Sequence, residues 1–199
     1  MNHKDMKRIL KNLWTCGLLA IALLASTPAV AQRVVAKTNL LYWGTGTPNL
    51  GLEVATGRKT SFSLHAGVQP WQYSDTQKLK HWLVQPEFRF WPCEVFMGHV
   101  IGIQALGGQF NAGGIDLPLG ILPTLKDNRY QGWAVGAGLS YGYHLLLNRR
   151  WSMEFGLAVG YLYVDYKKYR CLHCGDPLKK GHRNYLGPTK AAVNLIYNF

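Results

Sequence analysis

The sequence predicts an all-β protein, an eight-stranded antiparallel up-and-down transmembrane β-barrel, and three observations lead to that fold. Of the 199 residues, 48% are hydrophobic and only 16% are charged, whereas soluble domains carry about 25% charged residues. Glycine (22 residues) and aromatic residues (13%) are abundant, which favours strands over helices. Apolar and polar residues alternate with a period of two along much of the chain, as strands between two different environments require.

The first 31 residues stand apart and are typical of a secretory signal peptide. They begin with a basic segment, continue with an apolar run over residues 13–25, and end at the small-x-small cleavage site Ala29-Val30-Ala31. The alternative is a membrane anchor, but this run is shorter than the roughly 20 residues that a spanning helix needs. Cys16 stands at the start of the run rather than after it, which disfavours a lipoprotein. We expect a signal peptide over residues 1–31 and a mature β-barrel over residues 32–199.

Eight segments of the mature chain alternate apolar residues with small or polar ones. The predicted strands cover residues 33–43, 49–56, 61–69, 81–91, 99–106, 133–144, 153–163 and 189–199. Eight is an even number near the minimum for outer-membrane barrels. Pro86 lies inside the fourth segment, and because proline cannot donate to a strand ladder, we expect a β-bulge there.

The connections between these segments alternate in length. They are short at residues 57–60, 92–98 and 147–150, and longer at residues 70–80, 107–131 and 167–188. Short periplasmic turns and long extracellular loops are typical of outer-membrane barrels. The alternation predicts that both termini are periplasmic, although the first loop, residues 44–48, is short and departs from the trend.

The competing fold is a secreted β-sandwich or lipocalin-like barrel, in which aromatic residues would form the core and polar residues would face water. Glycines gathered on the polar face argue against it, because they suit a narrow lumen that admits only small side chains. Aromatic residues near the predicted strand ends fit a girdle at a membrane interface. They are Tyr141, Tyr143, Trp151, Tyr161 and Tyr163.

The inward face of the predicted barrel carries three acidic and three basic residues, with His65 beside them. They are Lys37, Glu53, Glu87, Arg89, Glu154 and Lys190. Side chains fill the interior of an eight-stranded barrel, and charges in so dry a space must pair. We therefore expect a structural charge network. A lipid-modifying enzyme that uses Ser140, His144 or His65 is the alternative, but their predicted directions point into the lumen and away from acyl chains.

The last long connection contains the motif Cys171-Leu172-His173-Cys174. A two-residue spacer is compatible with a disulfide, a thiol pair or half of a zinc site. In an oxidising exterior a disulfide between Cys171 and Cys174 is the default. A zinc site would need two more ligands, so we expect no metal and no cofactor. Cys93 falls in a predicted turn on the other side of the membrane and should pair with neither.

The same connection is strongly basic. Its cations are Lys167, Lys168, Arg170, Lys179, Lys180 and Arg183, and they face only Asp176. A charge run is usually a solvated face, but this one could bind phosphates of outer-leaflet lipids through charge-assisted hydrogen bonds. The connection over residues 107–131 displays apolar residues that are unusual in water and could meet a partner protein.

Two further patterns carry resemblances. Alternating Val193, Leu195, Tyr197 and Phe199 resemble the C-terminal signal that the bacterial barrel-assembly machinery reads in outer-membrane barrels, with Tyr197 and Phe199 as its main residues. Five short pieces span nearly all of the mature chain. They are Lys37-Thr38-Asn39-Leu40-Leu41-Tyr42, Thr47-Pro48-Asn49-Leu50-Gly51, Gln85-Pro86-Glu87-Phe88-Arg89, Cys171-x-x-Cys174-Gly175 and Gly187-Pro188-Thr189-Lys190-Ala191.

Through these pieces the chain resembles a Bacteroides-type family of small, functionally uncharacterised outer-membrane barrels, a domain of unknown function. More loosely it is similar to the eight-stranded OmpA-type barrel. The resemblance implies an outer-membrane β-barrel and brings no established activity. We expect a structural or surface-interaction role, in envelope integrity or beside an adhesin or fimbrial component, without catalysis; the partner class rests on this analogy alone.

The expected partners are the outer membrane with its lipopolysaccharide, the barrel-assembly machinery and a surface protein. Nucleic acid is not expected, and the barrel is expected to be a monomer. A small channel is a further alternative, but eight strands leave too little lumen for it.

Overall fold

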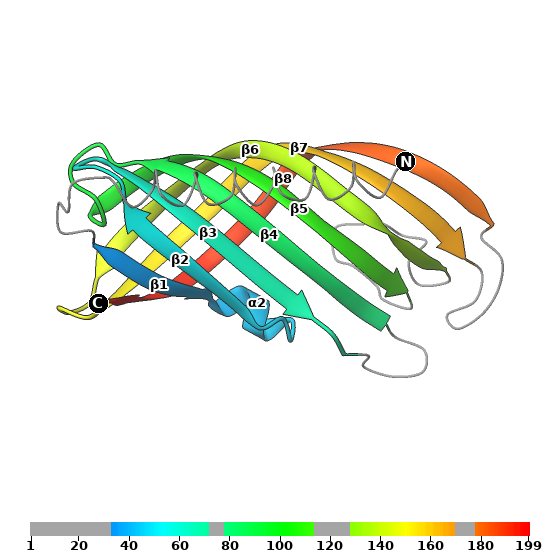
Figure 1. Cartoon of the computed structure of the whole chain (residues 1–199), viewed down its shortest axis with the longest axis horizontal. Helices are drawn as coiled ribbons and strands as arrows, with labels where there is room; N and C mark the ends of the chain where they lie inside the picture. Colours follow the sequence, from blue (N-terminus) through cyan, green and yellow to red (C-terminus); the bar gives the residue numbers. More distant parts are fainter. Residues whose placement is uncertain (1–32, 72–77, 114–127, 170–177) are drawn as a thin grey trace, which may run out of the picture. The chain divides into compact units, whose positions relative to one another are not determined.

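The computed structural model describes residues 33–71, 78–113, 128–169 and 178–199 (Figure 1). In this part of the chain eight antiparallel strands form a closed ring, in which each strand pairs with the next and β8 pairs with β1. The strands are β1 (Val34–Asn39), β2 (Asn49–Ala55), β3 (Thr60–Gln69), β4 (Lys78–Phe90), β5 (Gly98–Gly113), β6 (Arg129–Leu146), β7 (Trp151–Tyr169) and β8 (Lys179–Asn198). The predictions of an all-β fold and of eight antiparallel strands are confirmed.

The helix α2 (Leu40–Gly44) connects β1 to β2, at a place where the sequence predicted a continuous strand to residue 43. Asn39 ends β1 and caps this helix, because its side-chain oxygen accepts a hydrogen bond from the Leu41 backbone N–H at 3.1 Å. The Trp43 indole then donates to the Thr38 hydroxyl at 2.7 Å. The long first strand was wrong because alternation of polarity carries no information about this cap.

Among the helices that the described residues form, none has the length and hydrophobicity that a membrane crossing requires. The predicted signal peptide, residues 1–31, lies outside the described residues.

Pro86 does not produce the predicted bulge. The register between β4 and β5 is the same on both sides of it, since Val84 pairs with Gly107 and Glu87 pairs with Gln104. Proline interrupts the pairing without inserting a residue, because its missing N–H removes ladder bonds and leaves the strand length unchanged.

The register shift lies instead between β7 and β8. Ala158 pairs with Lys190, but the next residue, Val159, pairs with Pro188. Thr189 is therefore the extra residue of β8. A bulge changes the direction of the extra residue's side chain. The hydrogen bond between Gln104 and Thr189 depends on this change.

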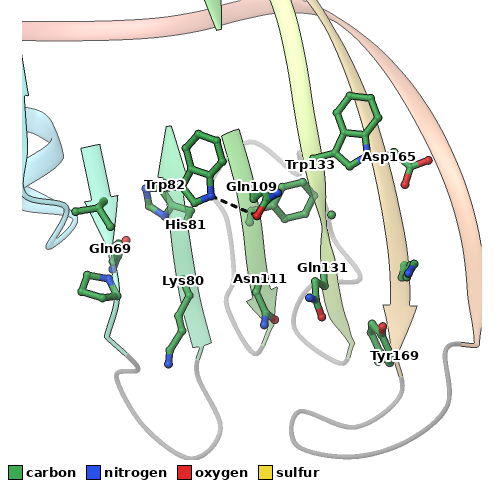
Figure 2. A pocket seen from close by; sticks show the side chains of 15 residues that line it. Gln69, Lys80, His81, Trp82, Gln109, Asn111, Gln131, Trp133, Asp165 and Tyr169 are labelled. Carbon is green, nitrogen blue, oxygen red and sulfur yellow. Dashed lines mark hydrogen bonds between the residues drawn. The ribbon is translucent and has the colours of Figure 1, made fainter. Parts of the chain in front are cut away.

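Strands β4 to β8 extend further than predicted at the end of the ring opposite the short turns (Figure 1). β5 continues to Gly113, β7 continues to Tyr169, and β8 already begins at Lys179, so the predicted connections 107–131 and 167–188 both contain strand. Outward side chains in the extensions of β5, β6 and β7 are mostly polar, and several of them line a groove (Figure 2). The apolar signal of a strand ends there although the backbone pairing continues.

An apolar cluster fills the inside of the ring at the end with the short turns, where the C-terminus also lies (Figure 1). The rings of Trp91 and Phe96 pack edge to face with centroids 5.7 Å apart. The Trp91 indole also donates to the Ser61 hydroxyl at 2.9 Å. The buried members of the cluster are Val35, Trp91, Val95, Phe96, Val100 and Ile196.

Strands β6 and β7 present glycines to the inside of the ring. A Cβ atom added to Gly160 would contact the backbone oxygen of Ala137 and stand 2.6 Å from the Cα of Gly138. Only glycine therefore fits at this position, where the two backbones curve closely together. The glycines let the ring close tightly on this side.

Candidate functional site

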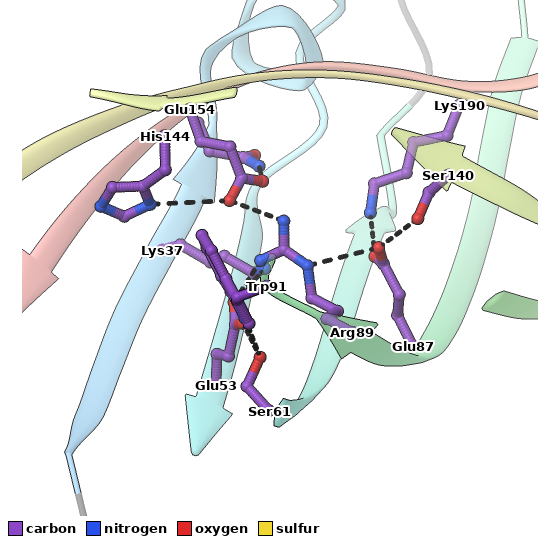
Figure 3. A network of polar contacts seen from close by, with 11 residues as sticks. Lys37, Glu53, Ser61, Glu87, Arg89, Trp91, Ser140, His144, Glu154 and Lys190 are labelled. Atoms are coloured by element: carbon purple, nitrogen blue, oxygen red, sulfur yellow. Dashed lines mark hydrogen bonds and ion pairs between the residues drawn. The ribbon is translucent and has the colours of Figure 1, made fainter. Parts of the chain in front are cut away.

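The inward charges predicted from the sequence meet inside the ring around the guanidinium of Arg89 (Figure 3). Arg89 Nη1 contacts Glu53, Nη2 donates to Glu154 Oε2 at 2.7 Å, and Nε lies 3.4 Å from Glu87 Oε1. The Arg89 guanidinium also stands 5.1 Å from the centre of the Trp91 ring. One side chain of β4 thus connects carboxylates of β2 and β7, two strands that do not neighbour it in the ring.

Two lysines complete this charge network. Lys37 Nζ lies 2.8 Å from Glu53 Oε2, and Lys190 Nζ lies 2.9 Å from Glu87 Oε2. All six charged side chains are at least nine-tenths buried. Three acids and three bases balance in charge, which a buried cluster requires because an unpaired ion in so dry a place is costly.

Neutral donors satisfy the remaining carboxylate oxygens. The Ser61 hydroxyl donates to Glu53 Oε1, and Asn194 Nδ2 donates to Glu154 Oε1 at 3.0 Å. Ser61 and Asn194 were not among the predicted site residues. Both occupy inward positions of alternating segments, and that signal could have drawn attention to them.

The residues of the enzyme alternative do not form a nucleophile and base pair. The Ser140 hydroxyl donates to Glu87 Oε1 at 2.6 Å. His144 Nδ1 lies 3.8 Å from Glu154 Oε2, and His65 Nε2 is buried without a hydrogen-bond partner. A nucleophilic serine needs a base within hydrogen-bond reach of its own hydroxyl. Here Ser140 and His144 contact carboxylates of the charge network, and His65 lies beside it.

The free space beside the network is small. A cavity between Glu87, Arg89, Ser140, Glu154 and Lys190 measures about 10 Å³, which is room for about one water molecule. Within the described residues, no group of histidine, cysteine, aspartate and glutamate side chains is arranged to hold a metal ion. The network can stabilise the interior and hold together strands that are not neighbours in the ring.

Thr189, the extra residue of the β8 bulge, turns its hydroxyl toward the interior. Gln104 Nε2 of β5 donates to Thr189 Oγ1 at 2.9 Å. The bulge therefore adds a polar contact between two strands that are not neighbours in the ring.

The predicted phosphate-binding loop is not one surface. Lys167 and Lys168 are the end of β7, and Lys179, Lys180 and Arg183 belong to β8. Lys167 pairs with Lys180, and the next pair joins Lys168 to Lys179. Because successive strand residues point to opposite faces, these cations divide between the two faces of the sheet. These five residues therefore lie on paired strands and not in a loop, and phosphate binding by them stays a prediction.

Other predicted residues fall outside the described part of the chain. Arg170 and the cysteines of the predicted disulfide, Cys171 and Cys174, lie there, and so does most of the apolar connection before β6. Cys93 is described, and it is a free, exposed thiol in the turn between β4 and β5.

The predicted assembly signal lies at the end of the ring with the short turns. The Tyr197 ring packs against Trp151 with centroids 5.1 Å apart and against Phe199 with centroids 5.3 Å apart. Phe199 is 82% exposed.

The outer face of the ring is apolar where the inner face is charged. Outward positions of every strand from β2 to β8 carry large hydrophobic side chains that are strongly exposed. They include Leu50, Leu52, Phe62, Leu64, Phe88, Ile103, Leu139, Leu157, Val159 and Leu186.

This protein is therefore an all-β ring of eight antiparallel strands. It has a buried charge network inside and apolar side chains outside. Residues 17–199 match the family described as "Protein of unknown function (DUF3575)", and the chain belongs to this family. Neither the curated proteins nor the solved structures contain a match to this chain.

Proposed function

We propose that the mature chain is an eight-stranded transmembrane β-barrel of a bacterial outer membrane, with a structural or surface-interaction role and no catalysis. The observation that carries this proposal is the reversed polarity of the ring. Charged side chains such as Arg89 and Glu53 are buried, and large apolar ones such as Leu157 are exposed. Water-soluble proteins bury the opposite set, and an apolar surface of this extent needs an apolar partner.

The height of the apolar band supports lipid as that partner. On β6 the outward side chains are apolar from Trp133 to Tyr143. About ten steps of about 3.3 Å make a strand length of about 33 Å. A tilt of about 40° reduces this length to about 25 Å across the bilayer, the height of the apolar band in outer-membrane barrels.

The charge network supports a structural interior over a channel or an enzyme. Ion pairs across the lumen, and a cavity of about 10 Å³, leave less space than a conducting path needs. Ser140 and His144 are buried and turn toward Glu87 and Glu154. The alternative, a lipid-modifying enzyme, would need one of them within reach of acyl chains.

The expected partners follow from the location. The outer membrane with its lipopolysaccharide would surround the barrel, and the barrel-assembly machinery would read Tyr197 and Phe199. A surface protein would meet the extracellular ends of the long strands. We expect the barrel to work as a monomer, because a closed ring has no free strand edge to pair with a second copy.

The test is to fold the mature chain in detergent and compare its gel mobility before and after heating. A closed barrel migrates faster unheated, because it stays compact in the detergent. The same mobility in both samples, together with a water-soluble folded state in the absence of detergent, would contradict the proposal.

The surface role has its own test. Removing residues 170–177, which lie between β7 and β8, should change the set of surface proteins that co-purify with the barrel, or the permeability of the envelope. If neither changes, the interaction role is wrong. Lipid mass spectrometry with the variants Ser140→Ala and His144→Ala checks the enzyme alternative, which predicts an altered lipid that these variants abolish.

A further inference from the structure

A groove of about 560 Å³ is lined by residues from the end of β3 and from strands β4 to β7, at the level where the apolar band ends (Figure 2). This volume lies within the range of small-ligand sites, about 300–1,000 Å³. Strand pairing builds the groove from two parallel rows of outward side chains. The row next to the apolar band, called the lower row, is Trp82, Gln109, Trp133 and Asp165; Figure 2 views the groove the other way up, with Trp82 and Trp133 toward the top. The upper row, further from the band, is Lys80, Asn111, Gln131 and Lys167.

The lower row offers aromatic faces beside polar groups. Trp82 and Trp133 are 45% and 43% exposed. Trp82 Nε1 donates to Gln109 Oε1 at 3.3 Å, which leaves the amide N–H groups of Gln109 free to donate (Figure 2). Indole rings at a membrane interface combine an apolar face with a wet edge, and the apolar face suits the C–H side of a sugar ring. The Asp165 carboxylate, in the same row, can accept hydroxyl donors.

The upper row places a cation on each side of two amides. Lys80 and Lys167 lie on β4 and β7, three strand spacings or about 14 Å apart, with Asn111 and Gln131 between them. Asn111 Oδ1 is buried and has no hydrogen-bond partner among the described residues. A buried acceptor without a partner is costly, and a ligand hydroxyl at this point would remove that cost.

A further cation borders the upper row. The Arg129 guanidinium stands 4.3 Å from the centre of the Tyr169 ring, and Tyr169 lines the groove. Aromatic faces, amides and flanking cations together match a saccharide that carries phosphate, because amides bond hydroxyls and lysines bond phosphate oxygens.

We propose that this groove binds the phosphorylated saccharide headgroup of an outer-leaflet glycolipid. The inference rests on the proposed outer-membrane location, which would place acyl chains against the apolar band directly below the groove. The sugar rings then lie on Trp82 and Trp133, and the phosphates lie at Lys80 and Lys167. The pairing of strands, and not a single basic loop, assembles the site.

The experiment measures binding of labelled lipopolysaccharide to the mature barrel in detergent micelles. Lys80→Gln/Lys167→Gln should lower the affinity by about tenfold or more, because it removes two charge-assisted contacts. Trp82→Ala/Trp133→Ala should lower it for phosphorylated and enzymatically dephosphorylated lipopolysaccharide alike. The lysine variant should bind the dephosphorylated form as the unaltered barrel does, which assigns the lysines to phosphate.

The matched control is Arg149→Gln/Arg150→Gln, which removes the same charge from the exposed turn between β6 and β7 at the other end of the ring. It should bind within about twofold of the unaltered barrel, since distant exposed charges are screened. An equal loss in this control, or no loss in the lysine variant, overturns the inference. Displacement of the lipopolysaccharide by inorganic phosphate alone also overturns it, because the occupant would then be a free anion.

Heat-dependent gel mobility separates this inference from the proposed function. If the unaltered chain shows no faster unheated form, both fall together. If it shows that form and the lysine variant binds lipopolysaccharide as well as the control does, only the groove is wrong.

Discussion

The inner and outer faces of β7 differ in polarity and in exposure. Glu154 points inward, is 3% exposed and pairs with Arg89, whereas Leu157, three residues further, points outward and is 66% exposed. In a water-soluble sheet the leucine would be covered and the glutamate would be wet. The contrast teaches that this sheet separates a polar interior from an apolar exterior, so burial in the ring follows the geometry and not the polarity of the residue.

The outward side chains of β7 change in polarity along the strand, whereas the inward side chains need no such change. Beyond Tyr163 the outward residues of β7 become Asp165 and Lys167, while pairing with β6 and β8 continues to the strand end. The outward side chains therefore change from apolar to charged part-way along the strand, as the proposed membrane location would require. Four substitutions test this difference between the two faces.

Arg89→Met should have the largest effect. It leaves Glu53, Glu87 and Glu154 without their shared cation, and removing one partner from a buried ion pair costs about 3–5 kcal/mol. Denaturant unfolding of the barrel in detergent or vesicles measures this loss. Arg58→Met, in an exposed turn, is the control. Equal stability of the two variants would mean that the network is not needed to hold the interior.

Leu157→Arg tests the outer face in the middle of the apolar band. An arginine at the bilayer midplane costs a barrel about 2–4 kcal/mol, so the variant should fold poorly in vesicles. Leu178→Arg makes the same exchange at an exposed residue before β8 and should cost little. A harmless arginine at residue 157 would indicate that this face meets water, and the proposed location would then fail.

Gly160→Ala tests the narrow part of the inner face. The added Cβ would meet the backbone of Ala137 and Gly138, and overpacking of this kind costs about 1–3 kcal/mol. Gly156→Ala is a matched control on the same face of the same strand, because its Cβ would have 3.7 Å to the nearest atom, the Tyr141 backbone oxygen. Thermal unfolding should separate the two variants, and identical midpoints would contradict the close approach of β6 and β7.

Thr189→Val should have the smallest effect. It removes the acceptor of the Gln104 hydrogen bond, which is worth about 1 kcal/mol. Thr189→Ser keeps the hydroxyl and should retain most of the stability. If valine and serine behave alike in denaturant unfolding, the bulge contributes through its backbone and not through this contact.

Much of the inner face could be predicted from the sequence. Alternation placed Lys37, Glu53 and Arg89 on one side, and the structure has all three buried. Their partners could not be predicted, because Arg89 meets Glu154 across 65 positions of the chain, and periodicity is a local property. The groove was missed for the same reason, since Lys80 and Lys167 become neighbours in one row only through three strand pairings.

The strand class, the number of strands and the polarity of each face were predictable from the sequence alone, because side-chain direction in a strand depends only on the parity of the position. Tertiary structure decided the register, the bulge at Thr189, the helix after Asn39 and the extension of β5 to β8 beyond the apolar band. The physical reason is that backbone pairing continues wherever a neighbouring strand offers hydrogen-bond partners. It does so whether or not the side chains still alternate.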